Sequence, residues 1–503
     1  MNQHTGGKSV AVIGAGLGSL SAAISLAAAG FKVSVFEKNE RVGGKLNVLK
    51  KGGFTFDLGP SILTLPQFFQ SLFARAGRRF EDYVPTVTVT PHWRNFFEDG
   101  TVLDLHMDPE AMHAELRKLK SYTPALWDRF QDFLRYSRQQ YDILDQGYLR
   151  EGLDTLWDFL RHYGVFRIGR QIDFRRTMAE SIRSFFDDPY LRATFEYFIK
   201  YVGSSAYAAP GYMNLMPNIQ FQYDLWYVPG GMYGIAQGLE KLAGELGIAI
   251  HTRSEVAAIL HADRTVTGLR LKDGQTVTSD YVVSNMEVIP AYEKLLGEGP
   301  AYLRKLEKFE PACSGLVLHL GTDRIYPQLA HHNFFYSRDQ EKHFATVFRD
   351  KQLPPDPTIY LVAVTRSDPS QAPAGCDNIK VLPHIPYLND QHPYTREDYL
   401  AFKDRVVEKL ERMGLTDLRK HTIVEDVWTP YDIQERYYSN RGSIYGVVSD
   451  WSKNYGFKAP KRSRRYQNLY FTGGSVNPGG GMPMVILCGQ KVADEIIARA
   501  GRG

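Results

Sequence analysis

The sequence predicts an α/β protein in which a nucleotide-binding domain, built from separated pieces of the chain, is interleaved with a second domain. The chain opens with a strand–turn–helix–strand pattern, "KSVAVIGAGLGSLSAAISLAAAGFKVSVFEKNE". Helical segments rich in aromatic residues and arginine follow, from about residue 68 to residue 220. The end of the chain returns to a strand, a glycine-rich loop and a helix. A chain of 503 residues also exceeds one ordinary hydrophobic core, so two or more domains are expected.

The first element is a βαβ unit. Val10 to Ile13 is a short apolar run that a glycine ends, and Lys32 to Phe36 is a β-branched, alternating run. Between them apolar residues recur at helical spacing, and Gly30 ends the helix. Those apolar positions are Leu20, Ala23, Ile24 and Ala27.

The turn of this unit carries the sequence "GAGLGS", Gly14 to Ser19. Gly14 permits the tight turn, and Gly16 lets backbone amides approach a pyrophosphate at the helix N-terminus. Ser19 stands where the strict pattern has a third glycine. Glu37 ends the second strand, where an acid receives a ribose hydroxyl. Together they predict a Rossmann-like dinucleotide site; the alternative is a structural turn and a surface glutamate.

A second glycine pair, Gly43-Gly44 in "RVGGK", follows the acid and is preceded by Arg41. This pattern resembles the FAD-binding motif of the flavin amine oxidase and carotenoid desaturase superfamily. The alternative is an ordinary glycine turn with a solvated arginine.

Six further segments extend the resemblance over nearly the whole chain. In order and spacing they are similar to bacterial carotenoid desaturases of the phytoene, dehydrosqualene and hydroxycarotenoid desaturase type. The segments are "GGFTFDLGPSILTLP", "FFEDGTVLDL", "VPGGMYGIAQGLEKLA", "VVSNMEV", "RGSIYG" and "NLYFTGGSVNPGGGMPMV". The resemblance implies a discontinuous FAD-binding domain of the GR2 type with an α+β substrate domain.

The resemblance also implies roles for individual residues. Gly14, Gly16 and Gly18 would face the pyrophosphate, Glu37 would bind the adenosine ribose, and Arg41, Gly43 and Gly44 would lie near the phosphates. Gly59, Pro60 and Ser61 would pass the isoalloxazine, and the backbone at Val256 would lie beside adenine. Gly473, Gly474, Gly480, Gly481 and Met482 belong to the loop that would cover the pyrophosphate and flavin. Related sequences commonly have histidine where this chain has Asn477.

That loop is expected to connect a strand, Leu469 to Phe471, to a helix that begins near Pro483. The positive N-terminus of this helix would favour the negative charge of a reduced flavin ring.

The domain boundaries follow from these segments. Residues 1–85, 221–295 and 433–503 are expected to form the FAD-binding domain. Residues 86–220 and 296–432 are expected to form the substrate-binding domain, with 123–200 helical.

Within the helical part, Thr155 to Met178 mixes arginines with aromatic and aliphatic residues. A segment of this kind is too polar to cross a bilayer but suits the headgroup layer; the alternative is a solvated helix with an ordinary core face. The basic residues are Arg161, Arg167, Arg170, Arg175 and Arg176, and the apolar ones Trp157, Phe159, Leu160, Tyr163, Val165, Phe166 and Ile168. No secretory signal and no run long enough to span a membrane is found, so a cytoplasmic protein on the membrane surface is expected.

The predicted function is an FAD-dependent carotenoid desaturase that introduces conjugated double bonds into an acyclic C30 or C40 carotene. Quinone or oxygen is the electron acceptor that the resemblance implies. The alternatives are a carotenoid oxidase, oxygenase or isomerase of the same fold, or a non-catalytic protein that binds prenyl lipids. A net charge of +4 does not suggest nucleic acid, and the histidines and the isolated Cys313, Cys376 and Cys488 show no metal-ligand spacing.

No catalytic residue is predicted. Six aromatic residues are candidates to line a polyene tunnel, although core packing explains each of them equally well. They are Tyr207, Tyr212, Phe221, Tyr223, Trp226 and Tyr227.

Overall fold

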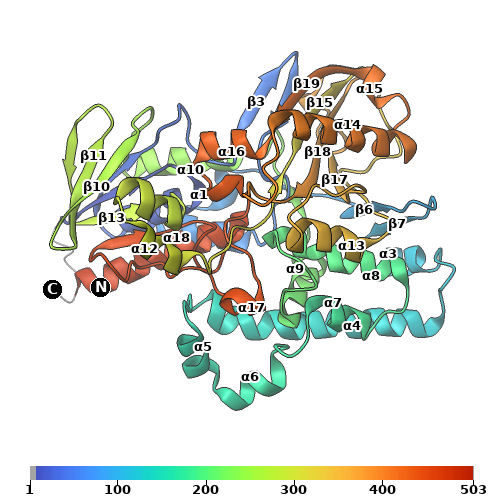
Figure 1. The fold of residues 1–503 in the computed structure, drawn as a ribbon, viewed down its shortest axis with the longest axis horizontal. Coiled ribbons are helices and arrows are strands. Elements are labelled where there is room, and N and C mark those ends of the chain that lie inside the picture. Colours follow the sequence, from blue (N-terminus) through green and yellow to red (C-terminus); the bar gives the residue numbers. More distant parts are fainter. Residues whose placement is uncertain (1–6, 502–503) are drawn as a thin grey trace.

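The structure, a computed structural model, describes residues 7–501, and it has two large sheets with a helical part beside them (Figure 1). The first sheet has five parallel strands in the order β20-β13-β1-β2-β9. They are β1 (Ser9–Ile13), β2 (Lys32–Phe36), β9 (Ala249–His251), β13 (Tyr281–Ser284) and β20 (Leu469–Phe471). Each of the three pieces predicted for the nucleotide-binding domain therefore contributes to one sheet. The domain boundaries themselves stay a prediction.

Two helices pack closely beside this sheet. Helix α1 (Leu17–Ala28) connects β1 to β2, and α18 (Met482–Ala500) follows the C-terminal glycine loop. A Cβ atom on Gly489 of α18 would collide with the backbone at Gly18 and Ala22, so the glycine permits the close approach of the two helices. Helices α2 (Gln67–Arg75) and α10 (Gly234–Glu245) also contact α1.

Two antiparallel hairpin structures extend from this part. One pairs β3 (Val48–Lys51) with β4 (Phe54–Asp57), and the other joins β10 (Val256–Ala262), β11 (Thr265–Leu271) and β12 (Thr276–Thr278). The turn between β11 and β12 contains Asp273 and Gly274, the latter at a φ of 95° that favours glycine.

The second sheet has eight strands, in the order β19-β15-β18-β17-β16-β6-β7 with β14 paired to β18. They are β6 (Trp93–Phe96), β7 (Val102–Leu105), β14 (Ser314–Gly315), β15 (Val317–Thr322), β16 (His332–Phe335), β17 (Ile359–Ala363), β18 (Asp377–Ile385) and β19 (Thr422–Trp428). Ile379 and Val381 of β18 pack in a core with α14 (Arg396–Arg412). Because side chains alternate along a strand, Lys380 and Leu382 face the other way, into a cavity.

The helical part begins where the sequence predicts. Thr123 accepts a hydrogen bond from the amide of Leu126, and Pro124 occupies the first turn. Its helices are α4 (Pro124–Leu144), α5 (Leu156–Tyr163), α6 (Val165–Gln171), α7 (Met178–Arg183), α8 (Pro189–Glu196) and α9 (Leu215–Tyr223), with a π-helical turn at Asp145–Leu149 and a 3-10 helix at Tyr197–Val202. Figure 1 shows α5 and α6 protruding at one side of the molecule. None of the helices described between residues 7 and 501 has the length and apolarity to cross a membrane.

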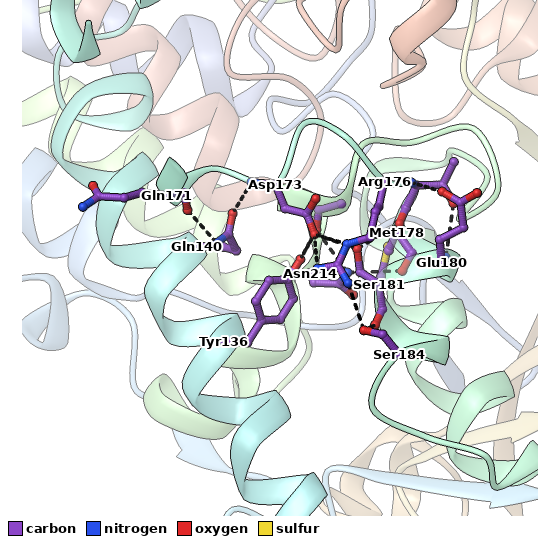
Figure 2. A network of polar contacts seen from close by, with 12 residues as sticks. Tyr136, Gln140, Gln171, Asp173, Arg176, Met178, Glu180, Ser181, Ser184 and Asn214 are labelled. Atoms are coloured by element: carbon purple, nitrogen blue, oxygen red, sulfur yellow. Dashed lines mark hydrogen bonds and ion pairs between the residues drawn. The ribbon is translucent and has the colours of Figure 1, made fainter. Parts of the chain in front are cut away.

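A polar network fastens the chain after α6 to its neighbours (Figure 2). The Asp173 carboxylate accepts hydrogen bonds from Tyr136 of α4 (2.7 Å), Ser181 of α7 (2.8 Å) and Arg176 (2.7 Å). The Arg176 guanidinium and the Tyr136 and Ser181 hydroxyls hold the pKa of Asp173 below its usual value, against the opposing effect of burial. Arg176 is thus engaged within the protein.

The remaining elements are short segments that connect the larger ones. They are β5 (Val87–Thr88), α3 (Pro109–Leu116), β8 (Trp226–Tyr227), α11 (Val288–Pro290), α12 (Pro300–Leu303), α13 (Gln340–Phe344), α15 (Leu418–His421), α16 (Pro430–Tyr437) and α17 (Trp451–Asn454).

Candidate functional site

A cavity of about 610 Å³ is lined by residues of both sheets and of the helical part. All of the predicted binding residues except Arg41 line it. They are Gly14, Gly16, Gly18, Glu37, Gly43, Gly44, Gly59, Pro60, Ser61, Val256, Gly473, Gly474, Gly480, Gly481 and Met482. The fold therefore brings together residues that are widely separated in the sequence.

The first glycine turn lies at the N-terminus of α1. Gly14 has a φ of 84°, and its amide donates to the Phe36 carbonyl (2.8 Å) at the end of β2. Gly16 is the N-cap and provides no side-chain cap, so the first amides of α1 remain available at the cavity. Ser19 is buried, and its hydroxyl donates to the Gly14 carbonyl (2.6 Å). At the position of the third glycine, serine thus fastens the turn.

Glu37 is buried at the end of β2, and it orders the same turn. Its Oε2 accepts a hydrogen bond from the Ala15 amide (2.7 Å), and its Oε1 accepts one from the Asn39 amide (2.8 Å). The carboxylate also lines the cavity. A negative charge is therefore fixed next to the glycine turn, where it can accept further hydrogen bonds.

The second glycine pair is packed against the first. The Gly43 amide donates to the Ala15 carbonyl (2.7 Å). Gly44 has a φ of 60°, and a Cβ atom there would lie 3.1 Å from the Cα of Gly16. The two glycine turns can approach this closely because neither carries a side chain.

Arg41 differs from expectation. Its side chain is about half exposed, lies 3.7 Å from Glu40 and does not line the cavity. The following residue, Val42, is fully buried, so the chain at this point directs the valine inward and the arginine toward solvent. The role of Arg41 near the phosphates stays a prediction.

The C-terminal glycine loop closes the cavity from another side. Gly473 has a φ of 106°, and a Cβ atom there would lie 2.5 Å from the side-chain nitrogen Nδ2 of Asn285. Gly481 is the N-cap of α18, also at a φ of 106°, and Met482 begins the helix. The positive end of a long helix therefore faces the cavity.

Asn477 belongs to this loop, but its side chain does not line the cavity and instead forms hydrogen bonds to neighbouring segments. It is fully buried, and its Oδ1 accepts hydrogen bonds from the Lys458 amide (2.8 Å) and the Tyr148 hydroxyl (3.0 Å). Its amide nitrogen donates to the Asp154 carbonyl (3.2 Å). At the position where related sequences commonly have histidine, this side chain supports the loop.

Beyond the glycine turns the cavity becomes apolar. Its walls here are aliphatic side chains and tyrosines from the helical part, the second sheet and the segment at Tyr445. They include Leu144, Leu149, Leu215, Met216, Ile219 and Leu382, with Tyr148, Tyr201, Tyr212, Tyr360 and Tyr445. Of the six aromatic residues predicted as a tunnel, Tyr212 alone lines the cavity; the other five pack elsewhere in the fold.

Sequence reasoning missed two lysines that bind backbone carbonyls at the cavity wall. Lys380 is buried, and its Nζ donates to the Gly59 carbonyl (2.5 Å) and the Asp57 carbonyl (3.1 Å). Burial lowers the pKa of Lys380 to about 8. Lys45, the last residue of "RVGGK", lies 3.3 Å from Glu287 and donates to the Ser443 carbonyl (3.0 Å). Lys45 directly follows the glycine pair, so the sequence could have pointed to it. Lys380 lies in a strand that carries no motif, so nothing in the sequence pointed to it.

Comparisons with known proteins agree with this geometry. The model of the flavin containing amine oxidoreductase family matches residues 20–497. The chain is 58% identical over 489 residues to a 4,4'-diapolycopene oxygenase from Methylomonas sp., covering 97% of this chain and 98% of that protein. It is 50% identical over 499 residues to a 4,4'-diaponeurosporene oxygenase from Staphylococcus aureus, covering 98% and 99%.

A solved structure of putrescine oxidase bound to putrescine matches with a TM-score of 0.66 at 14% identity, over 98% of this chain and 99% of that one, which shows a shared fold. The family that the sequence motifs predict is therefore confirmed. The chain belongs to the flavin-containing amine oxidoreductase family, and it is an FAD-dependent oxidoreductase.

Proposed function

We propose that this protein is a carotenoid oxygenase that uses FAD to introduce oxygen at an end of an acyclic C30 or C40 carotenoid. The observation that carries the proposal is the 58% identity, over nearly the full length of both chains, to an enzyme named 4,4'-diapolycopene oxygenase. A cavity that passes from a glycine-rich cradle to an apolar region supports it.

The cradle fits a flavin dinucleotide. The N-terminus of α1 has no side-chain cap and opens on the cavity, an arrangement that suits a pyrophosphate. The Ser61 hydroxyl is buried at the cavity wall without a hydrogen-bond partner among the described residues. A ligand with polar ring atoms would satisfy it. We assign the pyrophosphate to the turn of Gly14, Gly16 and Gly18, and the ribose to Glu37.

The other predicted residues would hold the remainder of the cofactor. The backbone at Val256 would contact adenine. The segment from Gly59 to Ser61 would lie along the flavin ring, and the segment from Gly473 to Met482 would lie on the opposite side of the ring. When bound, FAD would supply the two-electron redox chemistry. The N-terminus of α18 would favour negative charge next to it.

The protein's own groups would orient the polyene and keep water out. The aliphatic walls of the cavity remove the carotenoid from water, and the tyrosine rings offer flat surfaces along its length. Lys380 fixes the carbonyl of Gly59, and thereby the segment of Gly59 to Ser61, from the second sheet.

Desaturation is the second candidate. It rests on the resemblance of the glycine segments to carotenoid desaturases, and it would need the same cradle and the same apolar cavity. The two activities differ in their products, since desaturation lengthens the conjugated system without adding oxygen.

A carotenoid substrate must be collected from a bilayer, and the α5–α6 region (Leu156–Gln171) is our candidate for the contact. Trp157 is 79% exposed, and Arg161 of α5 and Arg167 and Arg170 of α6 are exposed as well. Two of the apolar residues predicted for this contact, Phe159 and Tyr163, are instead buried in a small core. The side chains of Val165 and Phe166 lie outside the described part of the structure.

The deciding experiment incubates the flavin-loaded protein with liposomes that carry 4,4'-diapolycopene, 4,4'-diaponeurosporene, dehydrosqualene or phytoene. Product masses and absorption spectra are then measured with oxygen, and with a quinone under nitrogen. A gain of oxygen in the first two carotenoids is the expected result. A shift to longer wavelength with loss of hydrogen only would establish desaturation instead, and the absence of product from all four would exclude both activities.

A further inference from the structure

One lysine lies at the apolar part of the cavity without an oxygen partner. Lys200 belongs to the 3-10 helix Tyr197–Val202, is 5% exposed and lines the cavity. Within residues 7–501 its Nζ makes no hydrogen bond and no ion pair, unlike Lys45 and Lys380, which bind backbone carbonyls. This ammonium or amine group therefore keeps its full donor capacity.

Aromatic rings surround the Lys200 nitrogen. Its Nζ lies 4.3 Å from the ring centre of Tyr360, 4.4 Å from that of Tyr201, and 4.8 Å from those of Trp93 and Phe334. Ring faces attract a cation, but they do not replace an oxygen acceptor for its N–H groups. The ring contacts therefore leave the N–H groups of Lys200 able to donate to an oxygen acceptor in the cavity.

A second unused donor lies nearby. Gln220 is buried and lines the same cavity, and its Oε1 accepts a hydrogen bond from the Tyr201 hydroxyl (3.3 Å). Its Nε2 is buried and has no partner among the described residues. Lys200 and Gln220 thus both contact Tyr201, and both have N–H groups that no atom of the described residues accepts.

The surroundings determine the kind of acceptor. Burial lowers the pKa of Lys200 well below its usual value, and no carboxylate acts on it. Because burial among aromatic rings disfavours charge here, a neutral acceptor such as a carbonyl oxygen suits this site better than a carboxylate.

The position connects this pair with the glycine loop. Gly203, three residues beyond Lys200, packs against the ring of Tyr445, and the Tyr445 carbonyl fills the space beside Gly480.

We propose that Lys200, together with Gln220, binds the carbonyl oxygen of an oxygenated carotenoid end group. The inference rests on the proposed carotenoid function and assigns the residues that distinguish an oxygenated end from a hydrocarbon end.

The test compares two ligands of equal chain length, 4,4'-diapolycopene and its monoaldehyde. Their dissociation constants are measured on the flavin-loaded protein in detergent micelles, from the quenching of tryptophan fluorescence and the shift of polyene absorbance. The wild type is expected to bind the aldehyde about five- to tenfold more tightly, the effect of one or two neutral hydrogen bonds. K200M should lose this preference and keep its affinity for the hydrocarbon.

Three further variants separate the effects of Lys200, of Gln220 and of a general change of buried charge. Q220L should lose part of the preference with Lys200 intact, and K200Q, which retains an N–H donor, should keep part of it. K409M is the matched control, because Lys409 is equally buried but donates to the Tyr336 carbonyl (2.8 Å) and to Asp356 and does not line the cavity. Its preference should equal that of the wild type.

The possible failures are distinct. A wild type that binds both ligands equally well, or variants at Lys200 and Gln220 that keep the full preference, would overturn the inference and leave the proposed function intact. A wild type that binds neither polyene would remove the proposed function, and this inference with it.

Discussion

The backbone carbonyl oxygen of Tyr445 lies in the space that a Cβ atom on Gly480 would occupy. The same carbonyl lies 2.8 Å from where a Cβ atom on Gly474 would be. The C-terminal glycine loop is therefore packed directly on Tyr445, and its glycines are required by the protein's own backbone as well as by the space left for a cofactor.

Gly480→Val is expected to abolish stable flavin binding, because the new side chain must displace either Tyr445 or the loop. The measurement is the flavin absorbance of the purified protein, with and without added FAD. Gly244→Ala is the control: Gly244 lies in α10 with open space around its Cβ position, so the change should leave the flavin content unaltered. A yellow, fully active G480V protein would contradict this account.

Glu37→Gln should weaken FAD binding about tenfold to a hundredfold, the usual effect of losing hydrogen bonds to a charged group. The carboxylate accepts the amides of Ala15 and Asn39, and the glutamine NH₂ would face one of these donors. The FAD dissociation constant of the stripped protein, measured by flavin fluorescence, tests this. Glu40→Gln, at an exposed position nearby, should change little; an equal loss in both variants would indicate a general effect of charge.

The elements of the nucleotide-binding part were predictable because their signals are local. The strands Lys32–Phe36 and Leu469–Phe471 are found with the predicted bounds, and α4 begins directly after Thr123, where the helical part was predicted to start. Glycine turns after strands are set by backbone sterics, which can be read from a few neighbouring letters.

The apolar part of the site was not predictable in the same way. Tyr223 and Tyr227 are aromatic residues of the expected kind, yet they pack in the core, whereas Tyr360 and Lys380 come from strands of the second sheet. Which face of β18 meets the cavity depends on its register with β15 and β17, and this long-range pairing leaves no local trace in the sequence.

The Lys380 amine should make stability depend on pH. Its pKa is about 8 in the folded protein and near its ordinary value of 10.5 when unfolded, so between these values the unfolded chain binds the extra proton. The free energy of unfolding should therefore rise, by up to about 3 kcal/mol through this group, as the pH increases from 8 to 10.5.

Chemical denaturation of wild type and Lys380→Met at several pH values from 7 to 10.5 measures this difference. The rise should be smaller in the variant by the contribution of Lys380, since Lys351 and Lys458, whose pKa values burial also lowers, remain. Below pH 8 the effect of Lys380 on the difference between the two proteins should be constant. Lys50→Met, which replaces an exposed lysine, should behave as the wild type. Parallel profiles for wild type and K380M would show that Lys380 does not titrate in this range.

Trp157→Ser should weaken binding to anionic liposomes about tenfold, because the most exposed large apolar side chain of α5 would no longer enter the headgroup layer. Arg161→Gln with Arg170→Gln should weaken it further, in a manner that salt suppresses, since each arginine near an anionic surface contributes about 1 kcal/mol. Cosedimentation with vesicles of phosphatidylglycerol and phosphatidylcholine measures both effects.

Ile423→Ser is the matched control: Ile423 is 55% exposed on β19, which Figure 1 places at the opposite side from α5. Equal losses for W157S and I423S would mean that the α5–α6 region is not the contact, and unchanged binding of W157S would mean that this tryptophan stays in water.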